Sequence, residues 1–186
     1  MDALTRARDG DYGPGGRVAP ALMTEILEKT EQAYQGEHNR PLGGYLRILG
    51  VYGGTVAVAA ATAALAGRRV PDHVGVLDLL LMAACTHKAS RLLAKDPVTS
   101  PIRAPFTEYE GQSGPSELQE KPRGPVGELL ACPFCLAQWI ATGYAAGLVL
   151  APRFTRLAGA TMTAVAISDW LQLGYAKLMK SADEAK

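Results

Sequence analysis

The chain has 186 residues, of which 48% are hydrophobic, 20% are charged and 6% are aromatic, and its formal net charge is +1. A nearly neutral chain with few aromatic side chains lacks the basic surface and the stacking groups that nucleic acids require, so we expect no nucleic-acid partner. Three cysteines exclude a dense disulfide framework. The mean hydropathy of +0.03 suits a soluble domain, but it averages strongly apolar segments with polar segments rich in Gly and Pro.

The first 40 residues are predicted to form a region of their own. Residues 1–20 are rich in Gly, Asp and Arg, and we expect them to be disordered. Residues 21–34 carry apolar side chains at helical spacing, which predicts an amphipathic helix. This helix either packs on the rest of the protein or lies at a bilayer interface, where its acidic polar face disfavours anionic lipid.

Residues 41–180 are predicted to form a membrane domain. Four apolar segments are candidate spans, near residues 48–66, 74–93, 129–151 and 154–173. The first and third contain no charged side chain and are long enough, as helices, to cross a hydrocarbon core about 30 Å thick. The second and fourth contain charged residues and are weaker candidates. The predicted fold class is all-α, an integral membrane bundle of about four transmembrane helices.

The orientation of this bundle follows from its basic residues. Lys and Arg near the span ends are more numerous on the side that would hold both termini, which predicts cytosolic termini. The protein would then be a multi-pass protein of the cell membrane, surrounded by lipid, with a structured cytosolic loop at residues 94–127. Within this loop residues 111–121 are polar, and we expect them to be mobile. Glycine pairs at Gly50–Gly54 and Gly143–Gly147 predict close helix approach in lipid.

A Cys-Pro-Phe-Cys element lies at the front of the third span. Pro133 suits the first turn of a helix, so we expect the helix to begin there with Cys132 near its N-cap. A thiolate at a helix N-terminus is stabilised by the dipole, which favours thiol–disulfide exchange of the Cys132–Cys135 pair with a substrate disulfide. The same spacing supplies half of a tetrahedral zinc site, but the chain has only three histidines and no second Cys-x-x-C. A third interpretation is structural, with both thiols packing the helix start. We expect no resident metal and no cofactor.

Several ionisable groups are predicted to meet these thiols at the cytosolic face. The candidate functional cluster comprises Cys132, Cys135, Arg91, Asp96, Arg103, Glu128 and Asp169. Because ionisable groups inside a span usually face the bundle and pair, we expect Asp169 to pair with Lys88 or Arg91. The alternative is a shallow polar pocket open to the cytosol, with the thiols on its rim. No residue is assigned a catalytic role.

The ordered pattern of these residues resembles a known family. SRLLAKDPVTSPIRAPFT at 90–107, PRGPVGELLACPFCLAQW at 122–139 and the later Ser168-Asp169 are similar to the bacterial family named domain of unknown function 1360. The resemblance covers about residues 45–175. The pattern positions carried over are Arg91, Asp96, Arg103, Pro105, Phe106, Gly127, Glu128, Cys132, Pro133, Cys135 and Trp139. The resemblance implies a small integral membrane protein, with one member labelled a sporulation protein and no established activity.

Two functions from different classes remain as hypotheses. The first is a non-enzymatic membrane scaffold or assembly factor that binds an unknown protein partner through the 94–127 loop. The second is a membrane thiol–disulfide oxidoreductase that uses Cys132 and Cys135. The second is disfavoured because an electron relay needs a further cysteine pair, and because this pair would face the reducing cytosol. A small transporter is disfavoured by the absence of an internal repeat.

Overall fold

The computed structural model describes residues 18–35, 41–114 and 116–184. The chain divides into two units, residues 1–43 and residues 44–186. In the first unit, helix α1 (Val18–Gln35) confirms the predicted amphipathic helix, and it begins slightly earlier than expected. Disorder is predicted for residues 1–20, but residues 18–20 belong to α1, and residues 1–17 lie outside the described residues. On the polar face of α1, Lys29 forms an ion pair with Glu25 over 2.7 Å.

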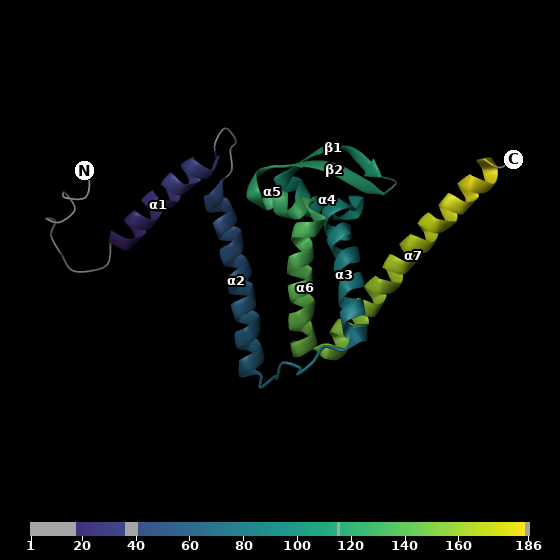
Figure 1. Ribbon diagram of the computed structural model, residues 1–186, viewed down its shortest axis with the longest axis horizontal. Helices are drawn as coiled ribbons and strands as arrows, with labels where there is room; N and C mark the ends of the chain where they lie inside the picture. The colour runs from purple at the N-terminus through teal and green to yellow at the C-terminus, as the bar shows by residue number, and fades with distance from the viewer. Residues whose placement is uncertain (1–17, 36–40, 115, 185–186) are drawn as a thin grey trace. The chain divides into compact units, whose positions relative to one another are not determined.

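The second unit is mostly helical, as predicted. Its long helices are α2 (Leu42–Leu65, which starts at the unit boundary), α3 (Val76–Lys95), α6 (Pro133–Leu150) and α7 (Pro152–Glu184). Helix α3 packs against α6 and α7, and α6 also contacts α7 (Figure 1). Helices α6 and α7 are separated only by Ala151 and form a helical hairpin. Helix α7 continues well past the predicted end at residue 173, because the polar residues that follow also favour a helix.

Two of these helices are long and apolar enough to cross a membrane. They are α2, with a mean hydropathy of 1.8, and α6, with a mean hydropathy of 1.3. Helices α3 and α7 also have sufficient length, but they include charged side chains such as Asp78, Lys88 and Asp169. Among the described residues, length and composition therefore support two of the four predicted spans.

The segment between α3 and α6 folds into a small structure that we call the cap, residues 96–131. It contains a 3-10 turn at Pro97–Thr99, helix α4 (Ser100–Arg103), a second 3-10 turn at Ala104–Phe106, strands β1 (Thr107–Gly114) and β2 (Glu117–Pro122), and helix α5 (Gly124–Ala131). Residues 111–121, which are predicted to be mobile, belong for the most part to an antiparallel hairpin that the sequence did not predict. The described residues are therefore mostly helical, as the predicted all-α class requires, except for this two-stranded hairpin.

The third predicted span is interrupted near its start. Cys132 has extended backbone angles, φ −104° and ψ 108°, and separates α5 from α6. Pro133 then occupies the first turn of α6, as expected, and cannot donate the hydrogen bond that would continue α5. The apolar run from residue 129 to 151 is therefore the end of one helix followed by a second helix.

The predicted glycine contacts are mostly absent from the described structure. A Cβ atom built on Gly50, Gly54 or Gly143 would meet nothing within 4 Å. Close approach occurs at the predicted Gly147, where a Cβ atom would overlap the side chain of Thr155 on α7, and at Gly159, where it would overlap the ring and hydroxyl of Tyr144. The spacing of small residues therefore located the close approach at Gly147 but not the one at Gly159.

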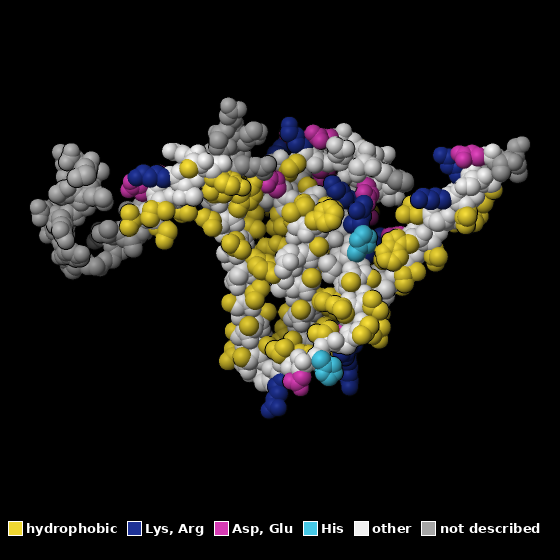
Figure 2. Space-filling model, viewed as in Figure 1, with side chains coloured by type: hydrophobic (Ala, Val, Ile, Leu, Met, Phe, Trp, Pro, Cys, Tyr) yellow, Lys and Arg dark blue, Asp and Glu magenta, His cyan; other side chains and the backbone are white. Residues whose placement is uncertain are grey.

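Large apolar side chains cover the outside of the helices. Leu49, Val58, Leu79, Phe154 and Leu171 are among those that are more than half exposed. The buried apolar residues are few, and several are small, such as Cys85 and Ala94. Figure 2 shows hydrophobic side chains over the middle of the long helices, with most charged side chains gathered toward the two ends. A surface this rich in apolar groups is typical of an interaction with lipid or protein.

Candidate functional site

The side chain of Arg103 anchors the cap to the end of α3. Its exposed fraction is 0%, and all five of its N–H donors are engaged. Nη1 donates to the carbonyl of Leu93 and to the hydroxyl of Thr99, both at 2.7 Å. Nη2 donates to the carbonyl of Asp96 at 3.1 Å. Arg103 thereby satisfies carbonyl groups that α3 leaves unpaired at its C-terminal end.

Glu120 on β2 provides the opposite charge for Arg103. Its two carboxylate oxygens accept from Nε at 2.7 Å and from Nη2 at 3.0 Å, which is a bidentate pair. The hydroxyl of Thr107 donates to the same carboxylate at 3.2 Å. The Glu120 side chain is only 6% exposed. One buried ion pair therefore joins the end of α3, helix α4 and both strands of the hairpin.

Two further members of the predicted cluster support the same junction. Arg91, on the last turns of α3, donates through Nε to Glu117 at the start of β2, over 3.0 Å. Asp96 accepts a hydrogen bond from the backbone N–H of Val98 at 2.8 Å and so caps the first 3-10 turn. Both side chains therefore make contacts within the protein.

Asp169 lies on α7 and pairs with Lys88 of α3, with 2.5 Å between Oδ2 and Nζ. This confirms one of its two predicted partners. A second ion pair joins the same helices further from the cap, where Nε of Arg156 lies 2.7 Å from Oδ1 of Asp78. Helices α3 and α7 run in the same direction from the end opposite the cap (Figure 1), and each contributes one charge to each ion pair, so the charges inside these two helices offset one another.

The thiols of Cys132 and Cys135 are near each other, with their sulfur atoms 2.7 Å apart. Sγ of Cys132 also accepts from the backbone N–H of Cys135 at 3.2 Å, which confirms that Cys132 is the N-cap of α6. Cys135 is exposed, and Cys132 is half-buried. Among the described residues, no group of three or more His, Cys, Asp or Glu side chains could hold a metal ion.

Glu128, the remaining member of the cluster, belongs to the contact between the cap and α2. Its Oε2 accepts from the hydroxyl of Tyr45 at 2.6 Å. Further along α2, the hydroxyl of Tyr52 lies 2.7 Å from Oγ1 of Thr142 and accepts from Nε2 of Gln138 at 2.9 Å. These bonds attach α2 to α5 at one level and to α6 at another.

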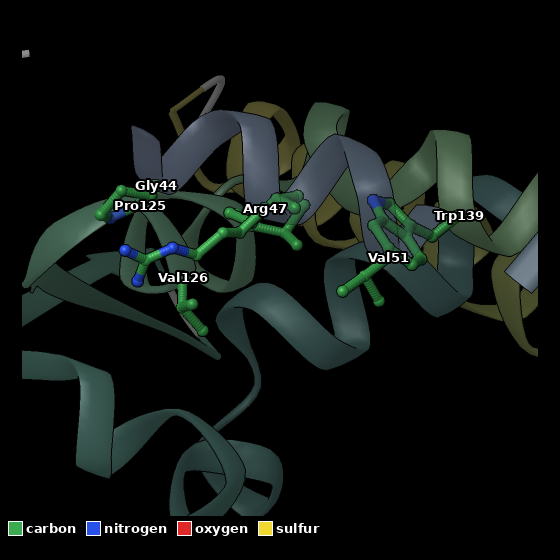
Figure 3. Close-up of a pocket in the computed structure, with 8 residues that line it drawn as sticks. Gly44, Arg47, Val51, Pro125, Val126 and Trp139 are labelled. Atoms are coloured by element: carbon green, nitrogen blue, oxygen red, sulfur yellow. The ribbon is translucent and has the colours of Figure 1, made fainter. Parts of the chain in front are cut away.

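A cavity of about 370 Å³ lies between these two attachment levels (Figure 3). It is lined by Gly44, Arg47, Ile48, Val51, Pro125, Val126, Leu129 and Trp139. The side chain of Arg47 extends toward Gly44 and Pro125, while Val51 and Trp139 lie toward the other end (Figure 3). The ring of Trp139 also packs edge-on against Tyr52, with 5.1 Å between centroids.

The seven predicted site residues therefore divide into separate contacts. Arg91, Asp96 and Arg103 join the cap to α3, while Asp169 joins α7 to α3. Sequence analysis missed Glu120 and Arg47, because a charged residue in a polar loop or at a span end is usually solvated, and only the fold reveals its surroundings.

A family comparison bears on this arrangement. The family model described as "Protein of unknown function (DUF1360)" matches residues 80–175. The chain belongs to the DUF1360 family. The match begins in α3, includes the whole cap, and ends in α7, so the part shared with other DUF1360 proteins contains every residue of the predicted cluster. No curated protein and no solved structure matches the chain.

Proposed function

We propose that this DUF1360 protein is a multi-pass membrane protein whose cap is a non-enzymatic binding platform for a protein partner. The membrane location is supported by α2 and α6, which are long and apolar enough to span, and by the exposed apolar side chains between two charged ends (Figure 2). In this proposal α3 and α7 also cross the bilayer. Their charges make this expensive in isolation, but the pairs Lys88–Asp169 and Asp78–Arg156 lower the cost.

The observation that carries the platform proposal is the buried Arg103–Glu120 pair. A loop that only connects two spans does not need an ion pair that fixes a hairpin to a helix end. The ionisable groups of the cluster form internal contacts, which favours a rigid surface over a reactive pocket. The outward residues of the hairpin, such as Tyr109 with a 66% exposed side chain, are available to a partner.

The membrane part of the proposal is tested by fractionation of cells that express the full chain. We expect the protein to stay with membranes after extraction with high salt and alkaline carbonate. Recovery of monodisperse protein from the soluble fraction without detergent would contradict it.

The platform is tested by site-specific photo-crosslinking in cells. A crosslinking residue at Tyr109 should give one discrete protein adduct, and the same residue at Leu157, which is exposed on α7, should not. The adduct should disappear when Glu120→Gln weakens the anchor of the hairpin. If Tyr109 gives no adduct, or the same adducts as Leu157, the platform proposal fails.

A thiol–disulfide oxidoreductase remains the alternative function. The neighbouring sulfur atoms and the exposure of Cys135 favour it. In such an enzyme, one thiolate attacks a substrate disulfide, and the second thiol resolves the mixed disulfide as the substrate is reduced. A mixed disulfide trapped in Cys135→Ser would support this function. If the thiols are structural, Cys132→Ala with Cys135→Ala should lower stability modestly and leave the Tyr109 adduct unchanged.

A further inference from the structure

The cavity between α2, α5 and α6 has the features of a lipid site. We propose that it binds a phospholipid with an anionic headgroup, with the headgroup at Arg47 and one acyl chain along the apolar lining. This inference rests on the proposed membrane location, because the ligand would enter from the bilayer. It does not depend on the platform role of the cap.

The lining of the cavity is chemically polarised. Seven of its residues are apolar or glycine, and Arg47 is its one charged residue. Figure 3 places the guanidinium near Gly44 and Pro125, with Val51 and Trp139 toward the opposite end. A cation at one end of an apolar hollow complements a molecule that has an anionic end and a hydrocarbon tail.

Arg47 has no counter-ion within the described part of the chain. The other arginines of the cap region are paired, Arg91 with Glu117, Arg103 with Glu120, and Arg123 with Glu108. No ion pair is formed by Arg47 among the described residues, and its side chain is exposed. A phosphate group accepts hydrogen bonds from the guanidinium fork, often through two parallel bonds.

The cavity is held open by the protein itself. The Tyr45–Glu128 bond ties α2 to α5, and the bonds of Tyr52 to Gln138 and Thr142 tie α2 to α6. Tyr45 and Tyr52 are about two helical turns apart, and Arg47, Ile48 and Val51 lie between them. The volume of about 370 Å³ lies within the range of small-molecule sites, about 300–1,000 Å³.

The location agrees with the expected distribution of lipid. Both α2 and α6 are helices suited to cross a bilayer, and Arg47 and Trp139 are residue types that anchor at its interfaces. In the proposed topology the cap faces the cytosol, and the cytosolic leaflet carries the anionic lipids. We therefore expect this site to select headgroup charge while accepting a range of acyl chains.

The test uses fluorescence of Trp139 in the full chain. The chain has two tryptophans, so Trp170→Phe leaves Trp139 as the single reporter. This protein is reconstituted into phosphatidylcholine vesicles that contain phosphatidylglycerol, with bromine on the acyl chains of one lipid or the other. Bromine quenches only tryptophans that it contacts. We expect brominated phosphatidylglycerol to quench as though enriched about fivefold over its mole fraction, equivalent to about 1 kcal/mol.

Three variants identify the site, and a fourth serves as the control. Arg47→Gln should abolish the excess quenching, and Arg47→Lys, which keeps the charge, should retain much of it. Val126→Phe should reduce the excess by filling the cavity without changing charge. Arg153→Gln removes an exposed arginine from the α6–α7 end of the helices, and it should leave the excess unchanged.

The outcomes separate the two proposals. Vesicle flotation is measured first, and protein that fails to float with lipid would contradict the membrane proposal. Protein that floats, but whose Trp139 is quenched only in proportion to bulk composition, would contradict the lipid site alone. Excess quenching that persists in Arg47→Gln would also overturn it.

Discussion

Lys88 of α3 and Asp169 of α7 form an ion pair with 2.5 Å between Nζ and Oδ2. Arg91, almost one turn further along α3, pairs with Glu117 of the hairpin instead. Lys88 and Arg91, which are three residues apart, therefore stabilise different contacts. Lys88 joins two long helices, and Arg91 joins a helix to the cap.

Because Lys88 and Arg91 have different partners, we predict that Asp169 is energetically coupled to Lys88 and not to Arg91. In a double-mutant cycle, Lys88→Met and Asp169→Ala should show a coupling free energy of at least about 0.5 kcal/mol. The control cycle of Arg91→Met with Asp169→Ala should show none, because these side chains have other partners. Unfolding in mixed micelles, followed by circular dichroism, measures both cycles. Coupling to Arg91 and not to Lys88 would contradict the pairing.

The anchor of the cap predicts a large difference between two arginines. Arg103→Ala leaves the buried Glu120 carboxylate without its partner, which should lower the free energy of unfolding by about 3–5 kcal/mol. Arg123 pairs with Glu108 at the surface, where their side chains are 57% and 52% exposed, so Arg123→Ala should cost at most about 1 kcal/mol. Should Arg103→Ala fail to fold, Glu120→Gln provides the same comparison. Equal losses at both arginines would refute the anchor role of Arg103.

The sequence predicted some elements well because their causes are local. The start of α6 follows from Pro133 and its neighbour Cys132, and both are visible in the sequence. The hairpin was missed because two irregularities, between Tyr109 and Gly111 and between Gln112 and Gly114, break the alternation that marks a strand. The role of Glu120 could not be predicted, because its burial depends on contacts with Arg103 that only the folded cap creates.

The contact between α6 and α7 predicts opposite effects at two helical glycines. Gly159→Ala should destabilise by about 1–3 kcal/mol, since the added methyl group would overlap the ring of Tyr144. Gly143→Ala should be neutral, or stabilising by up to about 1 kcal/mol, because it meets open space and alanine favours a helix. The same micelle unfolding assay measures the free energy of unfolding of both variants. A greater loss of stability in Gly143→Ala than in Gly159→Ala would contradict the contact between Gly159 and Tyr144.

The surface pair of the hairpin predicts a pH effect. Arg123 donates a hydrogen bond to Glu108 over 3.1 Å, and this bond, together with the positive charge, holds the pKa of the Glu108 carboxyl below its ordinary value. The stabilisation from this pair is thus complete above the ordinary pKa of about 4.3 and is lost as pH falls through the lower folded value. Arg123→Gln should raise the pKa, as measured by carbon-13 NMR of the carboxyl. An unchanged pKa would contradict this contact.

The number of membrane crossings is tested most directly by labelling introduced cysteines in intact cells. In a chain without its three native cysteines, Ser113→Cys lies in the hairpin, and Arg69→Cys lies between α2 and α3. Four crossings place these two positions on opposite sides of the membrane, whereas two crossings by α2 and α6 alone place them on the same side. We predict that an impermeant reagent added outside labels position 69 and not position 113. Labelling of both positions, or of position 113 alone, would contradict the proposed topology.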